Sequence, residues 1–381
     1  MMSGWPRYPV TVVGSWPRPS WLLEATKKQR ADLRTLQDEA TLLAIKYQED
    51  AGVDIVSDGE QRRDNFYSFI CDRIDGLRLM SMAELMDYVE DKAAFENLLR
   101  ALDVPAFGIK NPTVVGKLRL RHPLVLGDLD FLRQHTRKPV KVTLPGPYLL
   151  SRSMWVKALS EAAYPTRESL ADDVVSILRE ELHALADAGA DIVQFDEPVL
   201  TELVLAGKSA TRTFMCAALA ASASPEAELG FAVDLINRVV DGIEGPVVAL
   251  HVCRGNWSQN EDILLQGPYD ALIPYFRRMK VRQFVLEFAT PRAGSPAILR
   301  DLPLHSQIGF GAVNPRSFEV ESPDEIVARV RDVAELIGPD RVFLNPDCGF
   351  GTFADRPVAT SEIAFRKLCA LSEAAERLRH G

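Results

Sequence analysis

Cysteine is scarce in this sequence, with five residues among 381, at positions 71, 216, 253, 348 and 369. An odd, scattered count of this kind is not the pattern of a disulfide framework, and it fits a reducing compartment. The amino-terminal stretch also lacks a basic region followed by a long apolar run, so we expect no signal peptide. These absences together predict a cytoplasmic protein.

Long apolar runs are missing as well. No run approaches the roughly 20 residues that a transmembrane helix needs, which argues against a membrane-spanning protein. The chain has no basic run, and 44 Lys and Arg against 53 Asp and Glu give a net charge of −9. An acidic chain of this kind is not expected to have nucleic acid as its main partner. Its hydrophobic content of 47% is sufficient for a proper globular core.

Eight short apolar runs alternate with amphipathic helical stretches. The runs are residues 10–14, 51–56, 140–144, 188–193, 247–251, 283–287, 306–311 and 341–345. Two of them share the pattern Ala-Gly-x-Asp-Ile-Val, in which the glycine ends a helix, a buried parallel strand follows, and acidic residues stand at its carboxyl end. Eight such units predict an α/β fold, a (β/α)8 TIM barrel forming a single domain over residues 1–381. A doubly wound sheet is the main rival.

One connection is too long for a simple strand-to-helix unit. Residues 64–138 follow the second predicted strand, and we interpret them as an insertion that covers the barrel mouth, the end formed by the carboxyl ends of the strands. Within it, residues 82–102 are expected to be helical and residues 109–120 to form a β-hairpin arm. A second, smaller insertion is expected near residues 204–228.

Potential metal ligands stand at the ends of three predicted strands. His251 and Cys253 are two residues apart, so they project from the same face of one strand. Glu287 lies within the run QFVLEFA, at the end of the strand predicted over residues 283–287, and Cys348 follows the run VFLNP. Imidazole and thiolate are preferred zinc ligands, and three or four converging ligands make a zinc site. The alternatives are a chance His-x-Cys pair in a buried strand and, for Glu287, a buried salt bridge to an arginine.

Such a site favours one kind of chemistry. In TIM barrels the carboxyl ends of the strands carry the active site, so ligands from three strands at the mouth indicate a catalytic centre. Thiolate ligands donate charge and make zinc a weak Lewis acid, which suits binding a substrate thiol better than activating water. A metal-bound thiol loses its proton, and the thiolate is the nucleophile. The residues therefore predict alkylation of a thiol.

Six motifs carry a resemblance to a known family. They are VVGSWPRP, SDGEQRRDNF, LPGPYLL, VQFDEPVLTE, LHVCRGN and NPDCGFGT, and they span nearly the whole chain. The chain resembles the C-terminal catalytic barrel of cobalamin-independent methionine synthases, and its short single-barrel members most of all. The resemblance implies that zinc is bound by His251, Cys253, Glu287 and Cys348. It also implies that homocysteine is held at its amino acid end by Ser15, Glu60 and Asp196.

The sequence departs from the family where the methyl donor is expected. The family's catalytic histidine falls at Arg316, in the stretch GAVNPRS, and its folate-contacting arginine falls near Lys110. The tryptophan that stacks on the pterin falls near Ser153, with Trp155 two residues away, whereas Glu202 matches a folate-contacting glutamate. The amino-terminal barrel of the full-length enzymes is also not expected here. The thiol half of the site thus matches the family, and the donor half is altered.

Three functions stay open at this point. The first is a zinc-dependent methyltransferase that makes methionine from homocysteine, with methyltetrahydrofolate or a methylcorrinoid as the donor. The second is a zinc-dependent thiol alkyltransferase of the epoxyalkane:coenzyme M type, for which Arg18, Arg62 and Arg316 leave room. The third is a non-catalytic protein that binds zinc or an amino thiol. The expected partners are small molecules, with a homo-oligomer or a corrinoid protein as further candidates.

Overall fold

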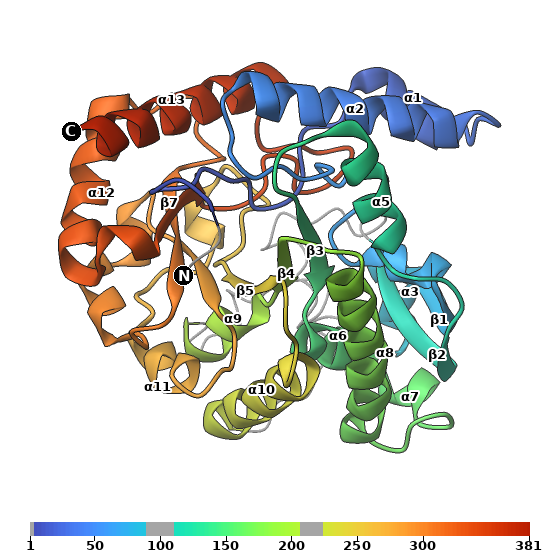
Figure 1. Cartoon of the computed structure of the whole chain (residues 1–381). Coiled ribbons are helices and arrows are strands. Elements are labelled where there is room, and N and C mark those ends of the chain that lie inside the picture. Colours follow the sequence, from blue (N-terminus) through green and yellow to red (C-terminus); the bar gives the residue numbers. More distant parts are fainter. Residues whose placement is uncertain (1–3, 89–109, 206–223) are drawn as a thin grey trace.

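The computed structural model describes residues 4–88, 110–205 and 224–381. Six parallel strands form one sheet in the order β3-β4-β5-β6-β7-β8, which is also their order along the chain. They are β3 (Lys141–Pro145), β4 (Ile192–Asp196), β5 (Val247–Val252), β6 (Gln283–Glu287), β7 (Gln307–Val313) and β8 (Val342–Pro346). Helices surround these strands (Figure 1). The predicted α/β class is therefore confirmed.

The two other predicted strands are present as short bridging segments. Isolated parallel bridges pair Val10 with Leu344, Thr11 with Ile55, and Val56 with Val140. The N–H of Lys141 donates to the carbonyl of Val56 (2.8 Å), and the N–H of Thr11 donates to the carbonyl of Leu344 (2.9 Å). These segments lie between the two outer strands of the sheet, β8 and β3, but the sheet itself contains six strands among the described residues.

Most connections between strands contain a helix. The helices before the sheet are α1 (Ser20–Lys27), α2 (Leu33–Asp50), α3 (Met82–Leu85) and α5 (Leu126–His135). Those that follow are α6 (Pro147–Met154), α7 (Lys157–Ser160), α8 (Arg167–Asp187), α9 (Val199–Leu205), α10 (Pro225–Val240), α11 (Ile273–Phe276), α12 (Pro323–Ile337) and α13 (Ser361–His380). Short 3-10 turns, Pro291–Ala293 and Pro296–Asp301, connect β6 to β7. Of these described helices, none has the length and apolar character needed to cross a membrane.

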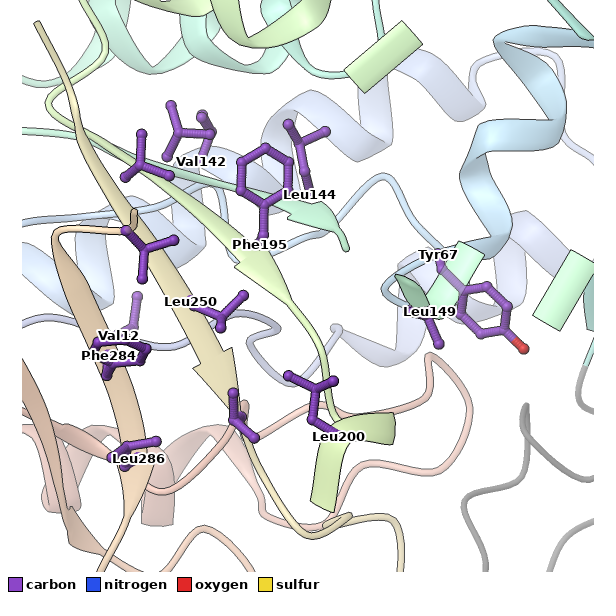
Figure 2. Packing of buried hydrophobic residues seen from close by; sticks show 14 of the residues in the cluster. Val12, Tyr67, Val142, Leu144, Leu149, Phe195, Leu200, Leu250, Phe284 and Leu286 are labelled. Carbon is purple, nitrogen blue, oxygen red and sulfur yellow. The ribbon is translucent and has the colours of Figure 1, made fainter. Parts of the chain in front are cut away.

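Alternating side chains give each strand two buried faces, as expected for a parallel sheet covered by helices. One face contributes a small inner cluster of Val13, Ile55, Ile192, Ala249, Val285 and Phe343. The other face belongs to the main core, and Figure 2 shows Val142, Leu144, Phe195, Leu250, Phe284 and Leu286 from its strands. Period-two alternation places Gln194 and Asp196 on the same side as Ile192, and His251 on the same side as Ala249.

The described part of the insertion differs from its prediction. Strand β2 (Lys110–Leu120) is one long strand that pairs antiparallel with β1 (Ile74–Ser81), so residues 110–120 do not form a hairpin by themselves. The predicted hairpin is absent because β2 finds its partner further back in the chain, in β1. Residues 82–88 are helical as predicted, whereas residues 89–102 and most of the second insertion lie outside the described residues.

One buried carboxylate fastens the end of the insertion to the sheet-covering helices. Glu181, on α8, accepts hydrogen bonds from the backbone N–H groups of Leu124 (2.8 Å), Val125 (2.7 Å) and Leu126 (3.0 Å). Its side chain is buried. Three N–H donors converging on one carboxylate form a strong arrangement, because bonds to a charged acceptor are stronger than neutral ones.

We therefore expect Glu181→Gln to lower the free energy of unfolding by about 2 kcal/mol, because an amide offers one acceptor oxygen in place of two. The measurement is equilibrium unfolding in urea. Glu180→Gln is the matched control, since Glu180 is the exposed neighbour on the same helix and should change stability by less than about 0.5 kcal/mol. Equal stability losses in the two variants would contradict the anchoring role of Glu181.

Candidate active site

Neighbouring parallel strands bring polar side chains together at one edge of the sheet. Asp196 ends β4 and is paired in register with His251 on β5. Cys253 follows β5 directly, and Cys348 follows β8. Carboxyl ends of parallel strands meet at one edge, so residues far apart in the sequence converge there.

Three of the four predicted metal ligands form a compact group. The ligand atoms of His251, Cys253 and Cys348 all lie within 4.8 Å of one another. The hydrogen bond with the Cys348 thiol lowers the pKa of Cys253 to about 6, although burial acts in the other direction. The same bond, together with burial, raises the pKa of Cys348. Two sulfurs that share a proton beside an imidazole provide the soft donor set that zinc prefers.

The histidine presents one free nitrogen to this group. Its Nδ1 lies 2.8 Å from Oδ1 of Asp196, whereas its Nε2 is buried and has no hydrogen-bond partner among the described residues. Burial alone would lower the pKa of His251, but the neighbouring Cys253 and Asp196 raise it to about 10. A buried nitrogen without a partner is costly, and a metal ion at Nε2 would satisfy it. The donor set therefore fits a zinc ion.

The fourth predicted ligand, Glu287, is not part of the compact group. Its carboxylate accepts from the backbone N–H (3.1 Å) and Nη1 (3.3 Å) of Arg254, from Nη2 of Arg292 (3.4 Å), and from the side-chain amide of Asn256. Burial would raise the pKa of Glu287, but Arg292 and Arg254 lower it overall. The buried salt bridge that the sequence left open as an alternative is thus present. A role for Glu287 as a metal ligand stays a prediction.

The compact group opens into a cavity at the carboxyl ends of the strands. Its lining includes Ser15, Glu60, Asp196, His251, Cys253 and Cys348, which are the three predicted substrate-binding residues and three predicted metal ligands. Phe66, Trp257 and Phe353 contribute apolar walls. A cavity with apolar walls and a few converging polar groups is the usual form of a small-molecule site.

The carboxylate of Glu60 lines this cavity. Glu60 is buried, and its Oε1 accepts from the hydroxyl of Thr143 (2.9 Å). Burial raises the pKa of the Glu60 carboxyl, and a cation arriving in the cavity would offset that desolvation penalty. The backbone of Glu60 has a φ of 54°, a left-handed conformation that is uncommon outside glycine and that clusters at functional sites.

The backbone beside Ser15 is closely packed, which the sequence analysis did not anticipate. A Cβ atom at Gly349 would lie 2.6 Å from Oγ of Ser15, and one at Gly14 would lie 2.8 Å from Oε1 of Glu60. A Cβ at Gly349 would also lie 2.8 Å from the backbone nitrogen of Ser15, so glycine is required there for the cavity wall to keep its shape, whereas at Gly14 only the end of the Glu60 side chain would have to move. The signal was present in the sequence, since both glycines adjoin residues that had been singled out.

The residues predicted to bind the methyl donor or to act on it do not line this cavity. Among the described residues that line the cavity, none is Lys110, Trp155, Glu202 or Arg316. Lys110 is exposed at the start of β2, and the indole N–H of Trp155 donates to the carbonyl of Tyr164 (3.0 Å). Glu202 is buried and accepts from Nη2 of Arg152 (3.1 Å).

Arg316 is buried next to the network that holds Glu287. Its Nε donates to Oδ1 of Asn256 (2.8 Å), and its Nη2 forms an ion pair with Oε1 of Glu261 (2.6 Å). Asn256 in turn contacts Glu287, so one amide connects the arginine that replaces the family histidine with the buried glutamate. This connection could not be read from the sequence, because Asn256 lies on an irregular loop and Glu261 begins a short 3-10 turn, Glu261–Ile263.

Comparisons with known proteins agree with the fold. Structures with the same fold include a B12-independent methionine synthase from a Shewanella species, with a TM-score of 0.75, 24% identity and 98% of both chains covered. A second is a B12-independent methionine synthase homologue from Listeria monocytogenes, with a TM-score of 0.67, 19% identity and 99% of both chains covered.

The curated relatives are closer in sequence. A methionine synthase from Thermococcus kodakarensis is 30% identical over 98% of this chain and 94% of the relative. One from Saccharolobus solfataricus is 26% identical over 99% of this chain and 97% of the relative. The model of the family described as "Cobalamin-independent synthase, Catalytic domain" matches residues 8–376. The chain therefore belongs to the cobalamin-independent methionine synthase family.

Proposed function

We propose that this chain is a zinc-dependent methyltransferase that transfers a methyl group to the thiol of homocysteine and forms methionine. The observation that carries the proposal is the single cavity shared by His251, Cys253 and Cys348 with the carboxylates Glu60 and Asp196. A thiol needs a soft metal, and an amino acid needs an anionic receptor for its ammonium group. The metal-binding group and the two carboxylates line the same cavity, so one small molecule could contact both.

The fold underlying the proposal is a closed (β/α)8 barrel over the whole chain. Support comes from the parallel bridges at Val10, Thr11 and Val56, which lie between β8 and β3 and would complete a ring of eight strands. Closure removes both sheet edges and gathers all carboxyl ends at one mouth. Coverage of that mouth by residues 64–138 stays a prediction, as does a cytoplasmic location.

His251, Cys253 and Cys348 would hold the zinc ion, with Glu287 as a further ligand if it leaves its arginine partners. When bound, zinc would lower the pKa of the homocysteine thiol, so that a thiolate is available near neutral pH. Asp196 fixes the ring of His251 through Nδ1. The aromatic side chains of Phe66, Trp257 and Phe353 would limit the access of water to the sulfur.

Glu60 and Asp196 would bind the substrate ammonium group, and Ser15 would bind its carboxylate. This assignment favours homocysteine over coenzyme M, because two buried acids would repel a sulfonate that brings no ammonium group. The epoxyalkane:coenzyme M type of reaction is therefore the less supported alternative.

The methyl donor is a separate part of the proposal. Methyl transfer from methyltetrahydrofolate requires a proton at the leaving nitrogen, which a histidine supplies well near neutral pH. A guanidinium group does not act as a proton donor in proteins, and Arg316 is engaged with Asn256 and Glu261. We propose that the enzyme prefers a donor whose leaving group needs no proton, such as a methylcorrinoid, brought by a corrinoid protein or free. In the competing proposal Glu202, paired with Arg152, supplies the proton.

The metal assignment predicts that Cys348→Ser removes most of the bound zinc, because the loss of one thiolate weakens the chelate. The measurement is zinc content per chain after dialysis against a chelator of moderate strength. Cys369→Ser is the matched control, since Cys369 lies on α13 outside the cavity and should leave the zinc content unchanged. Equal zinc content in the two variants would show that Cys348 is not a ligand.

The substrate assignment predicts that Glu60→Gln weakens homocysteine binding about tenfold, which corresponds to the loss of one charged hydrogen bond. Binding of γ-mercaptobutanoate, which has the same chain without the amino group, should be unchanged. Calorimetry on the zinc-loaded protein measures both affinities. The ammonium role is wrong if both ligands lose affinity to the same extent.

The donor proposal predicts faster methionine formation from homocysteine with methylcobalamin than with monoglutamyl methyltetrahydrofolate, under the same conditions. Arg316→His should raise the folate rate relative to the cobalamin rate, because it restores a group that can donate a proton. Rapid turnover with the folate donor in the unmodified enzyme, undiminished in Arg316→Ala, would contradict the proposal.

A further inference from the structure

A buried lysine lies inside the sheet below the candidate active site. Lys141 begins β3, and its side chain is fully buried. Its Nζ donates a hydrogen bond to Oε1 of Gln194 on the neighbouring strand β4 (3.2 Å). A buried ammonium group is costly unless it has partners, so its position requires an explanation. None of the roles assigned above uses this residue.

Gln194 connects Lys141 to residues that line the cavity. Its Nε2 donates to Oδ1 of Asp196 (2.9 Å) and to the carbonyl of Val13 (2.9 Å), and both of these residues line the cavity. A side-chain amide can donate only through its nitrogen. Because the lysine donates to the oxygen, the amide is held with its nitrogen toward Asp196 and Val13.

Asp196 then receives two bonds on one oxygen. Its Oδ1 accepts from Nε2 of Gln194 and contacts Nδ1 of His251 (2.8 Å). This arrangement fixes the plane of the carboxylate and keeps the proton of the imidazole on Nδ1. It leaves Nε2 of His251 for the metal and Oδ2 of Asp196 for a substrate cation.

We propose that Lys141 and Gln194 are positioning residues, which orient Asp196 and thereby set both the metal-binding nitrogen of His251 and the oxygen that receives the substrate ammonium group. The role in binding the substrate ammonium group rests on the proposed function. The role in orienting His251 for zinc depends only on the hydrogen bonds that connect Lys141, Gln194, Asp196 and His251. Neither Lys141 nor Gln194 lines the cavity, so both would act through Asp196.

The same sheet offers a matched control. Gln194 pairs in register with Ala249, and Ala249 pairs with Gln283 on β6, so the two glutamines occupy one layer. Gln283 is also buried, but its amide has no hydrogen-bond partner among the described residues. Gln283→Leu therefore makes the same change of size and polarity in the same layer without a link to Asp196.

The experiment compares Gln194→Leu, Lys141→Met and Gln283→Leu in the full chain. Zinc affinity is measured by competition with a chromophoric chelator, and calorimetry gives the affinities for homocysteine and γ-mercaptobutanoate. Circular dichroism and thermal unfolding establish that each variant is folded. We expect Gln194→Leu to lower zinc affinity about 10-fold, as is typical when a residue that orients a metal ligand is lost. Homocysteine affinity should fall more than that for γ-mercaptobutanoate.

Lys141→Met should also lower zinc affinity and the preference for homocysteine over γ-mercaptobutanoate, because the side-chain amide of Gln194 can then rotate. The double variant, Lys141→Met with Gln194→Leu, should lose no more than Gln194→Leu alone, since the lysine acts through the glutamine. Gln283→Leu should change zinc affinity and ligand preference less than 2-fold, within the small effects expected away from the string of contacts.

Two results would overturn the inference. The first is an equal loss of zinc affinity in Gln194→Leu and Gln283→Leu, which would mean that the Gln194 side chain only fills space. The second is a loss of zinc affinity in the double variant that equals the sum of the two single losses, which would mean that Lys141 acts independently of Gln194. If the unmodified protein does not prefer homocysteine to γ-mercaptobutanoate, the proposed substrate is wrong. A selective loss of zinc affinity in Gln194→Leu would still support the positioning of His251.

Discussion

One hydrogen bond, between Nδ1 of His251 and Oδ1 of Asp196, joins the two halves of the candidate site. The strand register creates it, because these residues are paired across β4 and β5. On one side it leaves Nε2 of the imidazole facing the thiols of Cys253 and Cys348. On the other it holds a carboxylate at the wall of the cavity. In the proposed function, metal binding and recognition of an amino acid would therefore be coupled through a single buried carboxylate.

A second network of charged side chains is centred on Glu287. Arg254 and Arg292 neutralise Glu287, and Asn256 connects that glutamate to Arg316. A buried carboxylate is tolerated only with such partners, which explains how Glu287 can end a strand in the interior. For Glu287 to become a metal ligand, it must exchange arginine and amide contacts for the metal. In the proposed metal-loaded enzyme, the position of Glu287 would thus be set by a competition between these arginines and the cation.

The regular parts of this molecule could be predicted from its sequence, since they follow from periodicity. Alternation within β5 placed His251 and Cys253 together, and strand ends of a parallel sheet brought Cys348 to them. The partners of Glu287 could not be predicted, because Arg254 lies on a loop and Arg292 in a short 3-10 turn, and hydrophobic periodicity determines the path of neither. Lys141 was missed although a lysine in a buried strand is the same signal that drew attention to the glutamate.

The central claim is that a substrate sulfur joins a metal held by Cys253 and Cys348. X-ray absorption at the zinc edge of the zinc-loaded protein tests it most directly, because it counts the sulfur atoms bound to the metal. The structure predicts two sulfur neighbours in the free enzyme, since the compact group contains two cysteines, and three after the addition of homocysteine. An unchanged count in the presence of saturating homocysteine would contradict the account.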